Sequence, residues 1–534
     1  MTSILRKNFI LICILLLVIV GIGLRFYKLD QIPPGISWDE AANGYNAWTI
    51  INYGRDEFGK DFPVYFTSFR DDKQPVHIYL TAPFVFLFGL NEFGTRFPSA
   101  LLGVLNILLI FLVGREMYNK WVGLGAAFSL TFSPYALQFS RFNHELNFSI
   151  FFLLLGLYLF YLGLRKNNIW LSISFISFGI CLLTYHSPKA VVPPLILILI
   201  LVYFRKLGQM KKKLILGLGF LSIFIILILF NPALLGGARA SQTLISEGQI
   251  KETHLYKTTN NQVLGFLNVV FDNYISHYSK KYFLDSGDIN GRHSSQAAGI
   301  IFTSELPFLI AGLISLCFMR SKANIILLSW LLLAPVPASV VTGAPHAGRA
   351  MFMMGSINLL IGLGVYWIFK IIKQWQFKMV ILIIFLAFFF YEFYTYLNFY
   401  YNDYPKKQAT EWQYGMKQIV EFIKGREDVS VVYITEERHQ PYIFFLYYLK
   451  TPLPEYLRRV NFDTTEKNVV NLVSNFGNYY FGGWDTVESF PNAGVYYVIT
   501  PSQYGGLRHQ KEFEVVKLIK YPDGSDAFYI ITKV

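Results

Sequence analysis

The chain has 534 residues, of which 54% are hydrophobic, 18% aromatic and only 15% charged. This composition argues against an ordinary soluble protein and is typical of a protein that crosses a membrane many times. The net charge of +13 does not indicate nucleic-acid binding, because the residues from Pro405 onward hold 15 basic and 15 acidic side chains, so the excess lies in the apolar part.

Eleven apolar runs approach the length of about 20 residues that a helix needs to cross a bilayer. We predict spans at about 8–27, 97–114, 121–139, 147–164, 169–185, 190–204, 214–231, 304–319, 323–341, 350–369 and 379–398. The first run follows Arg6-Lys7 like a secretory signal, but it is long and lacks a small-residue cleavage site. We interpret it as a retained helix.

Basic side chains are concentrated in alternate connections between these runs. Half of those in the apolar part lie in six short segments, near Arg6, Arg115, Arg165, Arg205–Lys213, Arg320 and Lys370–Lys378. Such an alternation follows the positive-inside rule. It predicts a multi-pass protein of the cell membrane with a cytoplasmic N-terminus, and eleven crossings then put the C-terminus outside.

Two long connections are predicted on the outer side, at about 28–96 and 231–303. The first contains a short interfacial helix, Trp38–Tyr53, and the apolar stretch Pro75–Leu90. That stretch is short for a crossing, and counting it as one would invert the basic-loop pattern downstream. We therefore interpret it as interfacial or re-entrant.

The last part of the chain, 405–534, is predicted to be a small extracytoplasmic α/β domain behind a membrane module of residues 1–400. A helical period covers Trp412–Lys424, and Val429–Ile434 and Val495–Ile499 resemble strands. Two further strand-like runs, Phe513–Lys520 and Phe528–Thr532, flank a Tyr-Pro-Asp-Gly turn, which is a hairpin signal.

Three charged clusters fall at the ends of apolar runs: Ser37–Glu40, Arg141–Glu145 and Pro345–Arg349. The predicted topology places all three on the outer side, opposite the basic loops. Carboxylates and cations collected at one face of a membrane protein suggest an active site there.

Ser37–Glu40 has two interpretations. Ser-x-x-Glu is a capping box, and an acidic first turn complements the helix dipole, so these residues can simply begin a helix. Alternatively, Asp39 is an ionised general base at the membrane surface, where a bound acceptor would exclude water.

The other clusters also have a plain and a functional interpretation. Arg141, His144 and Glu145 can be headgroup contacts, or Glu145 can be a second acidic group with His144 polarising an acceptor. Lys73 lies above an apolar stretch and can hold a lipid phosphate. A further cationic set, His346, Arg349 and Arg292, can bind the same kind of group, because an arginine at a helix start opposes the dipole unless an anion is near.

Phosphate-binding loops, dinucleotide fingerprints and zinc-ligand spacings do not occur in the sequence. We therefore expect no nucleotide cofactor and no required metal. A divalent cation is not excluded, because Asp39, Glu40 and Glu145 could supply oxygen ligands.

Several of these segments resemble the GT-C fold glycosyltransferases. Trp38-Asp39-Glu40 with its interfacial helix resembles their acidic first-loop motif, most of all in the protein O-mannosyltransferase and aminoarabinose-transferase-like group (glycosyltransferase family 39-like). Asp71–Val76 resembles that group's Lys-Pro-Pro segment, with Gln74 in place of the first proline. Gly94–Ala100 is similar to the start of its second span, and Pro-His-x-x-Arg at Pro345–Arg349 recurs in bacterial members.

The resemblance covers roughly residues 8–400 and implies an activity. Such enzymes move a sugar from a polyprenyl-phosphate carrier to an acceptor on the non-cytoplasmic face, with inversion. Asp39 matches the family's base, Glu40 the adjacent acidic residue that orients the acceptor, and Lys73 and Arg349 the groups that hold the donor phosphate.

Two alternatives remain. A polysaccharide ligase or polymerase would also use a lipid-linked donor, but through external Arg and His residues, so that His346 and Arg349 would matter more than Asp39. A lipid-linked-sugar transporter or flippase would place ionisable residues deep inside spans, and the predicted span centres carry almost none.

Overall fold

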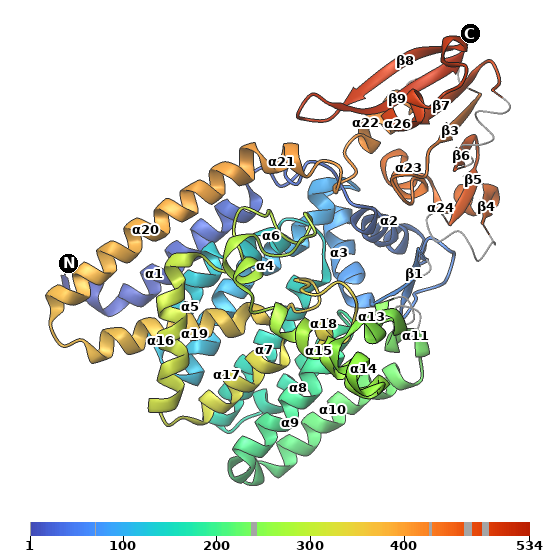
Figure 1. Cartoon of the computed structure of the whole chain (residues 1–534). Coiled ribbons are helices and arrows are strands. Elements are labelled where there is room, and N and C mark those ends of the chain that lie inside the picture. Colours follow the sequence, from blue (N-terminus) through green and yellow to red (C-terminus); the bar gives the residue numbers. More distant parts are fainter. Residues whose placement is uncertain are drawn as a thin grey trace. The chain divides into compact units, whose positions relative to one another are not determined.

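A computed structural model of the chain describes residues 2–69, 71–236, 243–424, 426, 430–463, 472–482 and 491–534, without the side chains of residues 2–7 (Figure 1). The chain divides into two compact units. The membrane unit comprises residues 1–27 and 99–400, and the loop–tail unit comprises residues 28–98 and 401–534.

The membrane unit is built from long apolar helices. In the described part of the chain, eight helical stretches are long and apolar enough to cross a bilayer. They are α1 (Thr2–Phe26), α4 (Glu92–Met117), α7 (Glu145–Lys166), α9 (Ser187–Gly208), α10 (Lys211–Leu229), α17–α18 (Lys322–Leu333 and Val336–Ser339), α19 (Met353–Ile371) and α20 (Trp375–Asn402). The predicted polytopic helical fold is therefore confirmed.

The three other predicted spans are also helical but shorter. They are α8 (Trp170–Leu182), α16 (Leu306–Phe318) after the 3-10 turn η2 (Thr303–Glu305), and the pair α5 (Lys120–Phe132) and α6 (Pro134–Ser140). Pro134 separates α5 from α6, because proline lacks the backbone N–H that would continue the helix. The stretch predicted as re-entrant forms α3 (Pro75–Phe88), which has only 14 residues.

Glycines let three of these helices pack backbone against backbone. A Cβ on Gly125 of α5 would lie 2.8 Å from the Cα of Gly362 in α19, and one on Gly312 of α16 would lie 2.1 Å from the carbonyl oxygen of Leu360. Small residues at such seams replace the hydrophobic effect as the basis of helix association in lipid. The helices α5, α16 and α19 thus form one tight layer.

The connection between α10 and α16 consists of short helices. These are α11 (Pro232–Leu235), α13 (Glu247–Glu252), α14 (His254–Thr259), α15 (Gln262–Ser276) and the π-turn η1 (Lys281–Asp285). Asn273 ties α15 to the chain before α19 by donating to the backbone oxygens of Ser339 and Val341.

In the loop–tail unit, the chain between α1 and α4 shares one hydrophobic core with the C-terminal domain. Its elements are α2 (Trp38–Tyr53), the hairpin of β1 (Phe66–Ser68) and β2 (Asp71–Lys73), and α3. Tyr45 on α2 donates to the backbone oxygen of Thr451 at 2.8 Å. The hydroxyls of Thr95 and Tyr447 are hydrogen-bonded at 2.8 Å, so the tail and the first loop are one folded body.

The tail is an α/β sheet domain, as predicted. Seven strands run in the order β4-β5-β6-β3-β7-β9-β8, and β3 is parallel to both β6 and β7. The strands are β3 (Val431–Ile434), β4 (Val460–Phe462), β5 (Val473–Phe476), β6 (Tyr479–Phe481), β7 (Val495–Ile499), β8 (Phe513–Lys520) and β9 (Asp526–Lys533). The predicted β8–β9 hairpin is confirmed; Val429 of the predicted β3 lies outside the described residues.

Short helices cover this sheet and lead into it. They are α21 (Tyr404–Lys407), α22 (Met416–Lys424), α23 (Tyr442–Leu449), α24 (Leu453–Arg459), α26 (Pro501–Gly505) and the 3-10 turn η3 (Gln510–Glu512). The residues of α23 from Tyr442 to Tyr447 are all buried, and this helix packs against α2.

Candidate active site

Asp39 and Lys73 form an ion pair at the start of α2. The Lys73 Nζ donates to Asp39 Oδ1 at 2.8 Å; the lysine side chain is 8% exposed and that of Asp39 is 47% exposed. Lys73 ends β2, and the β1–β2 register fixes its backbone opposite Phe66. The accessible carboxylate of Asp39 therefore lies beside a lysine whose side chain is largely buried.

Glu40 is the next residue along α2, but it is fully buried. Its carboxylate accepts from Arg96 Nε at 3.0 Å and Nη2 at 3.2 Å, and both side chains are 0% exposed. Arg96 also donates to the backbone oxygens of Leu29, Pro33 and Gly35. Ser37 and Glu40 form the predicted capping box. The contacts of Glu40 thus fix the entry into α2 and, with it, the position of Asp39.

Glu57 is a buried carboxyl in the connection between α2 and β1. Its backbone N–H donates to Asn46 Oδ1 at 2.9 Å. Burial, and next the charge of Asp56, raise the pKa of Glu57 to about 8, while the nearby Lys73 opposes this rise. The environment of Lys73 therefore includes a second carboxyl that titrates near neutral pH.

A tail residue also reaches the beginning of α2. The ring of His439, in the connection between β3 and α23, meets Trp38 edge to face with centroids 5.7 Å apart. His439 and Gln440 both have a positive φ, at 57° and 49°, which is uncommon for non-glycine residues. The fold thus holds this imidazole beside the residue that precedes Asp39.

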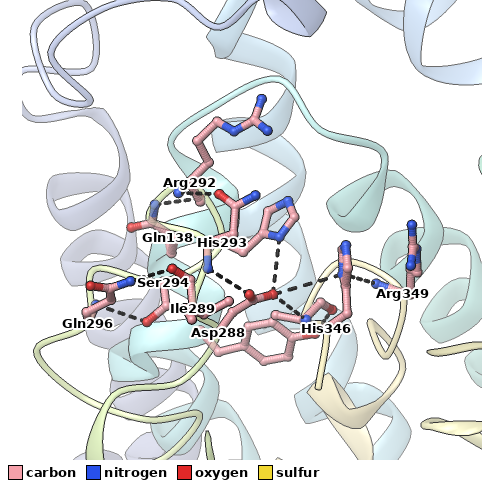
Figure 2. Close-up of polar contacts among 12 residues, drawn as sticks. Gln138, Asp288, Ile289, Arg292, His293, Ser294, Gln296, His346 and Arg349 are labelled. Carbon is pink, nitrogen blue, oxygen red and sulfur yellow. Dashed lines mark hydrogen bonds and ion pairs between the residues drawn. The ribbon is translucent and has the colours of Figure 1, made fainter. Parts of the chain in front are cut away.

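In the membrane unit, Asp288 lies beside two imidazoles, one from its own loop and one from the connection before α19 (Figure 2). Its Oδ2 lies 3.2 Å from Nδ1 of His293 and 3.9 Å from Nδ1 of His346, and it accepts from the backbone N–H of Ala347 at 2.7 Å. The two imidazole centroids are 4.8 Å apart. We call Asp288, His293 and His346 the Asp–His cluster.

The electrostatics of the cluster follow from burial and charge. Burial by itself would raise the pKa of Asp288, but the hydrogen bond and charge of His293 hold it below the ordinary value of an aspartate. Burial, and next the charge of His293, lower the pKa of His346 well below that of a free histidine. The cluster therefore favours an ionised Asp288 and a neutral His346.

His144 and Glu145 lie at the start of α7 beside this cluster. The ring centroids of His144 and His293 are 5.7 Å apart. The His144 Nδ1 accepts from the backbone N–H of Leu146 at 3.1 Å and lies 3.5 Å from Glu145 Oε2. The structure thus brings together His144, Glu145 and His346, which the sequence singled out separately.

The three arginines of the predicted site have different surroundings. Arg141 is buried and donates to the backbone oxygens of Leu24, Arg25 and Tyr27 at the end of α1. Arg349 donates to the backbone oxygen of Thr342 at 2.9 Å. Arg292 belongs to the same loop as Asp288, but in Figure 2 its guanidinium points away from the cluster.

The Asp–His cluster has the donor set of a cation site. Each of its three side chains offers one ligand atom, and these atoms lie within 4.8 Å of one another. Imidazole nitrogens and a carboxylate suit zinc, and three protein ligands with an open position are typical of catalytic zinc. The same atoms also satisfy one another as hydrogen bonds, so the described residues fit either a hydrogen-bonded triad or a three-ligand metal site.

Sequence reasoning missed Asp288, Glu57 and His439. Asp288 lies in a long polar loop that stands out in the sequence, but nothing in the loop distinguishes it from Asp285. Glu57 and His439 carry no local signal, because each acquires its neighbours through tertiary contacts with residues far away in the sequence.

The comparisons with known proteins agree with the predicted resemblance. Residues 72–234 match the family model described as dolichyl-phosphate-mannose-protein mannosyltransferase. The Bacillus subtilis proteins YkcB and YycA, both named as candidate mannosyltransferases, are 27% identical over 172 residues and 25% identical over 143 residues. These matches cover 32% and 27% of this chain, which spans only about a quarter of the length of these relatives, 24% and 21%.

Solved structures match over nearly the whole chain. ArnT from Cupriavidus metallidurans, solved with bound undecaprenyl phosphate, gives a TM-score of 0.59 at 13% identity and covers 97% of both chains. AglB, the oligosaccharyltransferase of Archaeoglobus fulgidus, solved with an inhibitory peptide and a dolichol phosphate, gives a TM-score of 0.54 at 14% identity, covering 98% of this chain and 74% of that one. The resemblance to GT-C membrane glycosyltransferases is thus confirmed at the level of the fold.

Proposed function

We propose that this protein is a glycosyltransferase that moves a sugar from a polyprenyl-phosphate carrier to a hydroxyl or similar group of a protein, lipid or glycan, with inversion, on the outer face of the membrane. The fold, the family-model match and the names of the relatives all support lipid-linked glycosyl transfer. The observation that carries the proposal is the ion pair between the accessible Asp39 and the largely buried Lys73.

The proposed reaction uses each member of this pair once. Asp39 accepts the proton of the acceptor hydroxyl while the acceptor oxygen forms a bond to the anomeric carbon. The bond from that carbon to the phosphate oxygen breaks on the opposite face, and the lipid phosphate leaves with the electron pair. Lys73 compensates the added charge on this leaving group.

The 2.8 Å pair implies an order of binding. In an inverting transfer the base and the phosphate flank the sugar on opposite sides, so Asp39 and Lys73 cannot remain in contact during the reaction. A donor phosphate that binds Lys73 replaces Asp39 as the partner of the lysine and frees the carboxylate as a base. We therefore expect the donor to bind before the acceptor.

The remaining predicted site residues are assigned roles on the same proposal. His346, Arg349 and Arg292 bind the sugar or its phosphate, His144 and Arg141 bind the substrates, and Glu145 is a second acidic group. Glu40 orients the acceptor side of the site through its hold on α2.

We also propose that transfer needs no divalent cation, because a carboxylate base and a lysine are sufficient for this chemistry. Full activity after chelation by EDTA is expected. Loss of activity that returns with added zinc or manganese would instead assign the Asp–His cluster, or the carboxylates of Asp39, Glu40 and Glu145, to a metal.

The decisive experiment is glycosyl transfer by the purified protein in lipid nanodiscs. A panel of radiolabelled polyprenyl-phosphate sugars is supplied with a membrane extract as the source of acceptor. Wild type should transfer one of them, and Asp39→Asn should lose at least about a hundredfold in rate, the range expected for a missing general base. Asp61→Asn is the control, because it removes an exposed carboxylate from the same unit.

One observation favours a second candidate, a polysaccharide ligase or polymerase that also uses a lipid-linked donor. The described loops of the membrane unit that are predicted to be external hold a cluster of three histidines and an aspartate, His144, His293, His346 and Asp288. If His346→Gln abolishes transfer and Asp39→Asn does not, the ligase-like mechanism replaces the carboxylate base. If no lipid-linked sugar is consumed by folded protein, a transporter takes first place.

A further inference from the structure

A groove of about 670 Å³ opens in the membrane unit at the end remote from the Asp–His cluster. Its floor is the tight layer of α5, α16 and α19, and its outer wall is the first half of α20. Apolar side chains such as Leu124, Phe128 and Leu382 line most of it. The volume falls within the range of small-molecule pockets, and the walls are membrane-spanning helices.

The groove begins where the aromatic packing of α20 ends. Farther along this helix, Phe389 and Phe393 meet Phe128 and Phe132, with centroid distances of 5.0 and 4.9 Å. Phe385 meets Phe308 of α16 at 4.7 Å and closes the inner end. Between Phe385 and the beginning of α20, the wall stands away from the floor.

Two lysines line the groove at its other end. Lys370 is in the last turn of α19, and Lys378 follows after the short α19–α20 connection. Lys378 is half-buried and shares the inward-facing stripe of α20 with Leu382, Phe385 and Phe389, at spacings of four, seven and eleven residues. An ammonium at this end of the helix is stabilised by an anionic lipid headgroup beside it.

No carboxylate supplies this negative charge within the described residues. Among the described residues, Lys370 lies over the ring of Tyr366, and neither Lys370 nor Lys378 has an ion-pair partner. The acidic side chain that lines the groove, Glu305, is buried and already accepts from Ser129 Oγ at 2.6 Å and from the backbone N–H of Phe302. The basic end is therefore electrostatically unbalanced in the folded chain.

Aromatic residues place this basic end at the level of the lipid headgroups. Trp121 at the start of α5 is exposed, and Lys370 lies over the ring of Tyr366, 6.0 Å from its centroid. Tryptophan, tyrosine and lysine together are typical of the bilayer interface. The part of α19 that follows its kink at Met354 and Gly355 is about 24 Å long and separates this end from Arg349, so the groove is distinct from the Asp–His cluster.

We propose that this groove binds an anionic glycerophospholipid, one acyl chain lying between α20 and the floor and the headgroup phosphate between Lys370 and Lys378. Charge complementarity selects the anionic headgroup, and the apolar walls receive the chain. The bound lipid fixes the first half of α20 to the bundle. The proposal rests on the membrane-spanning fold and is independent of the proposed transfer reaction.

Native mass spectrometry of the detergent-purified protein tests this site by titration with phosphatidylglycerol and, separately, with phosphatidylcholine. Wild type should retain phosphatidylglycerol in preference to phosphatidylcholine. The double variant Lys370→Gln/Lys378→Gln should weaken retention roughly thirtyfold, since each lysine near a headgroup is worth about one kcal/mol. Lys211→Gln/Lys212→Gln removes the same charge from another basic loop and should bind as wild type does.

A second variant tests the acyl-chain part of the groove while keeping both lysines. Leu382→Trp fills the space beside Phe385 and should also weaken retention, whereas Leu201→Trp on the exposed face of α9 should not.

Equal binding by wild type and both groove variants overturns the proposal. So does an equal loss in the Lys211/Lys212 control, which would indicate diffuse charge only. Tighter retention of a polyprenyl phosphate with the same lysine dependence would assign the groove to the carrier lipid instead.

Discussion

Two adjacent carboxylates on α2 have opposite environments. The Asp39 side chain is half exposed beside Lys73, whereas Glu40 and its partner Arg96 are fully enclosed. A buried charge that loses its partner is strongly destabilising. The fold therefore leaves the aspartate of the Trp-Asp-Glu motif accessible and encloses the glutamate, which fixes the start of α2.

Replacing Glu40 by Gln should destabilise the protein by about 3–5 kcal/mol, because the Arg96 guanidinium would be left buried without its counter-charge. The melting temperature in detergent should fall by several degrees. Asp61→Asn, which removes an exposed carboxylate paired with an exposed arginine, is the control and should melt as wild type does. An unchanged melting temperature with lost transfer would instead show that Glu40 itself contacts the acceptor.

Glu57 should make stability depend on pH. Its pKa is about 8 in the folded protein and near the ordinary glutamate value of 4.5 in the unfolded chain. Between these pH values the folded state binds a proton that the unfolded state lacks, so stability falls as pH rises through the window and levels off above pH 8. The effect should be on the order of a few kcal/mol.

Melting temperatures from about pH 5 to 8.5 test this behaviour. Wild type should lose stability over the window, and Glu57→Gln should remove most of that slope and be the more stable protein at its upper end. Asp61→Asn, an exposed carboxylate in the same connection, should keep the wild-type slope. Parallel curves for Glu57→Gln and wild type would mean that Glu57 is ionised throughout.

At the residue scale, sequence reasoning found the groups with local signals and missed those made by tertiary contacts. Asp39 follows a capping serine and Lys73 precedes an apolar helix, so both could be singled out before folding was known. The short distance between their side chains could not be predicted, because it depends on the β1–β2 hairpin. Asp288 acquires His346 as a neighbour only when the loop after α15 meets the connection before α19.

At the scale of elements, the close packing of α2 on the tail depends on one glycine. A Cβ on Gly44 would lie 2.7 Å from both Thr95 Oγ1 and a ring carbon of Tyr447, whose hydroxyls are hydrogen-bonded. Gly44→Val should force α23 away from α2, at the cost of about 1–3 kcal/mol typical of overpacking. Limited proteolysis should then cleave the tail faster.

The control for this change is Gly219→Val, since a Cβ there would meet nothing within 4 Å. It should leave the proteolysis rate of the tail unchanged. If Gly44→Val also leaves it unchanged, α23 is not held by this contact and the shared core of loop and tail is looser than the structure indicates.

Helix existence was predictable because apolar length is the strongest sequence signal in a membrane protein. Every predicted span lies on a helix, and the β8–β9 hairpin follows its turn chemistry. The span predicted at 304–319 agrees with η2 and α16 together, which cover Thr303–Phe318. Helix α8 ends at Leu182, three residues before the predicted end of its span, although the apolar run continues with Leu183. The sheet order of the tail was also out of reach, because strand pairing between β3 and β7 joins residues about 60 positions apart.

At the scale of the whole molecule, the number of crossings decides which face carries the tail. Eight helical stretches in the described chain have the length of a span. Adding α5–α6, α8 and α16 gives the eleven predicted crossings and an external tail; counting α3 as well would give twelve and a tail on the side of the N-terminus. Helix α8, with 13 residues, is only about 20 Å long, so length alone does not decide.

Cysteine labelling in intact cells measures this directly. Starting from a variant with Cys13, Cys181 and Cys317 replaced by Ala, single cysteines are placed at Ser525 in the β8–β9 turn and at Lys212 in the first turn of α10, both exposed. A membrane-impermeant maleimide should label Ser525→Cys in intact cells and Lys212→Cys only after permeabilisation, because α10, α16, α17, α19 and α20 make five crossings between them. Labelling of both positions in intact cells would mean an even number of crossings. Labelling of Lys212→Cys alone would invert the topology, which would place the tail with Asp39 in the cytoplasm and remove the basis for a donor presented on the outer face.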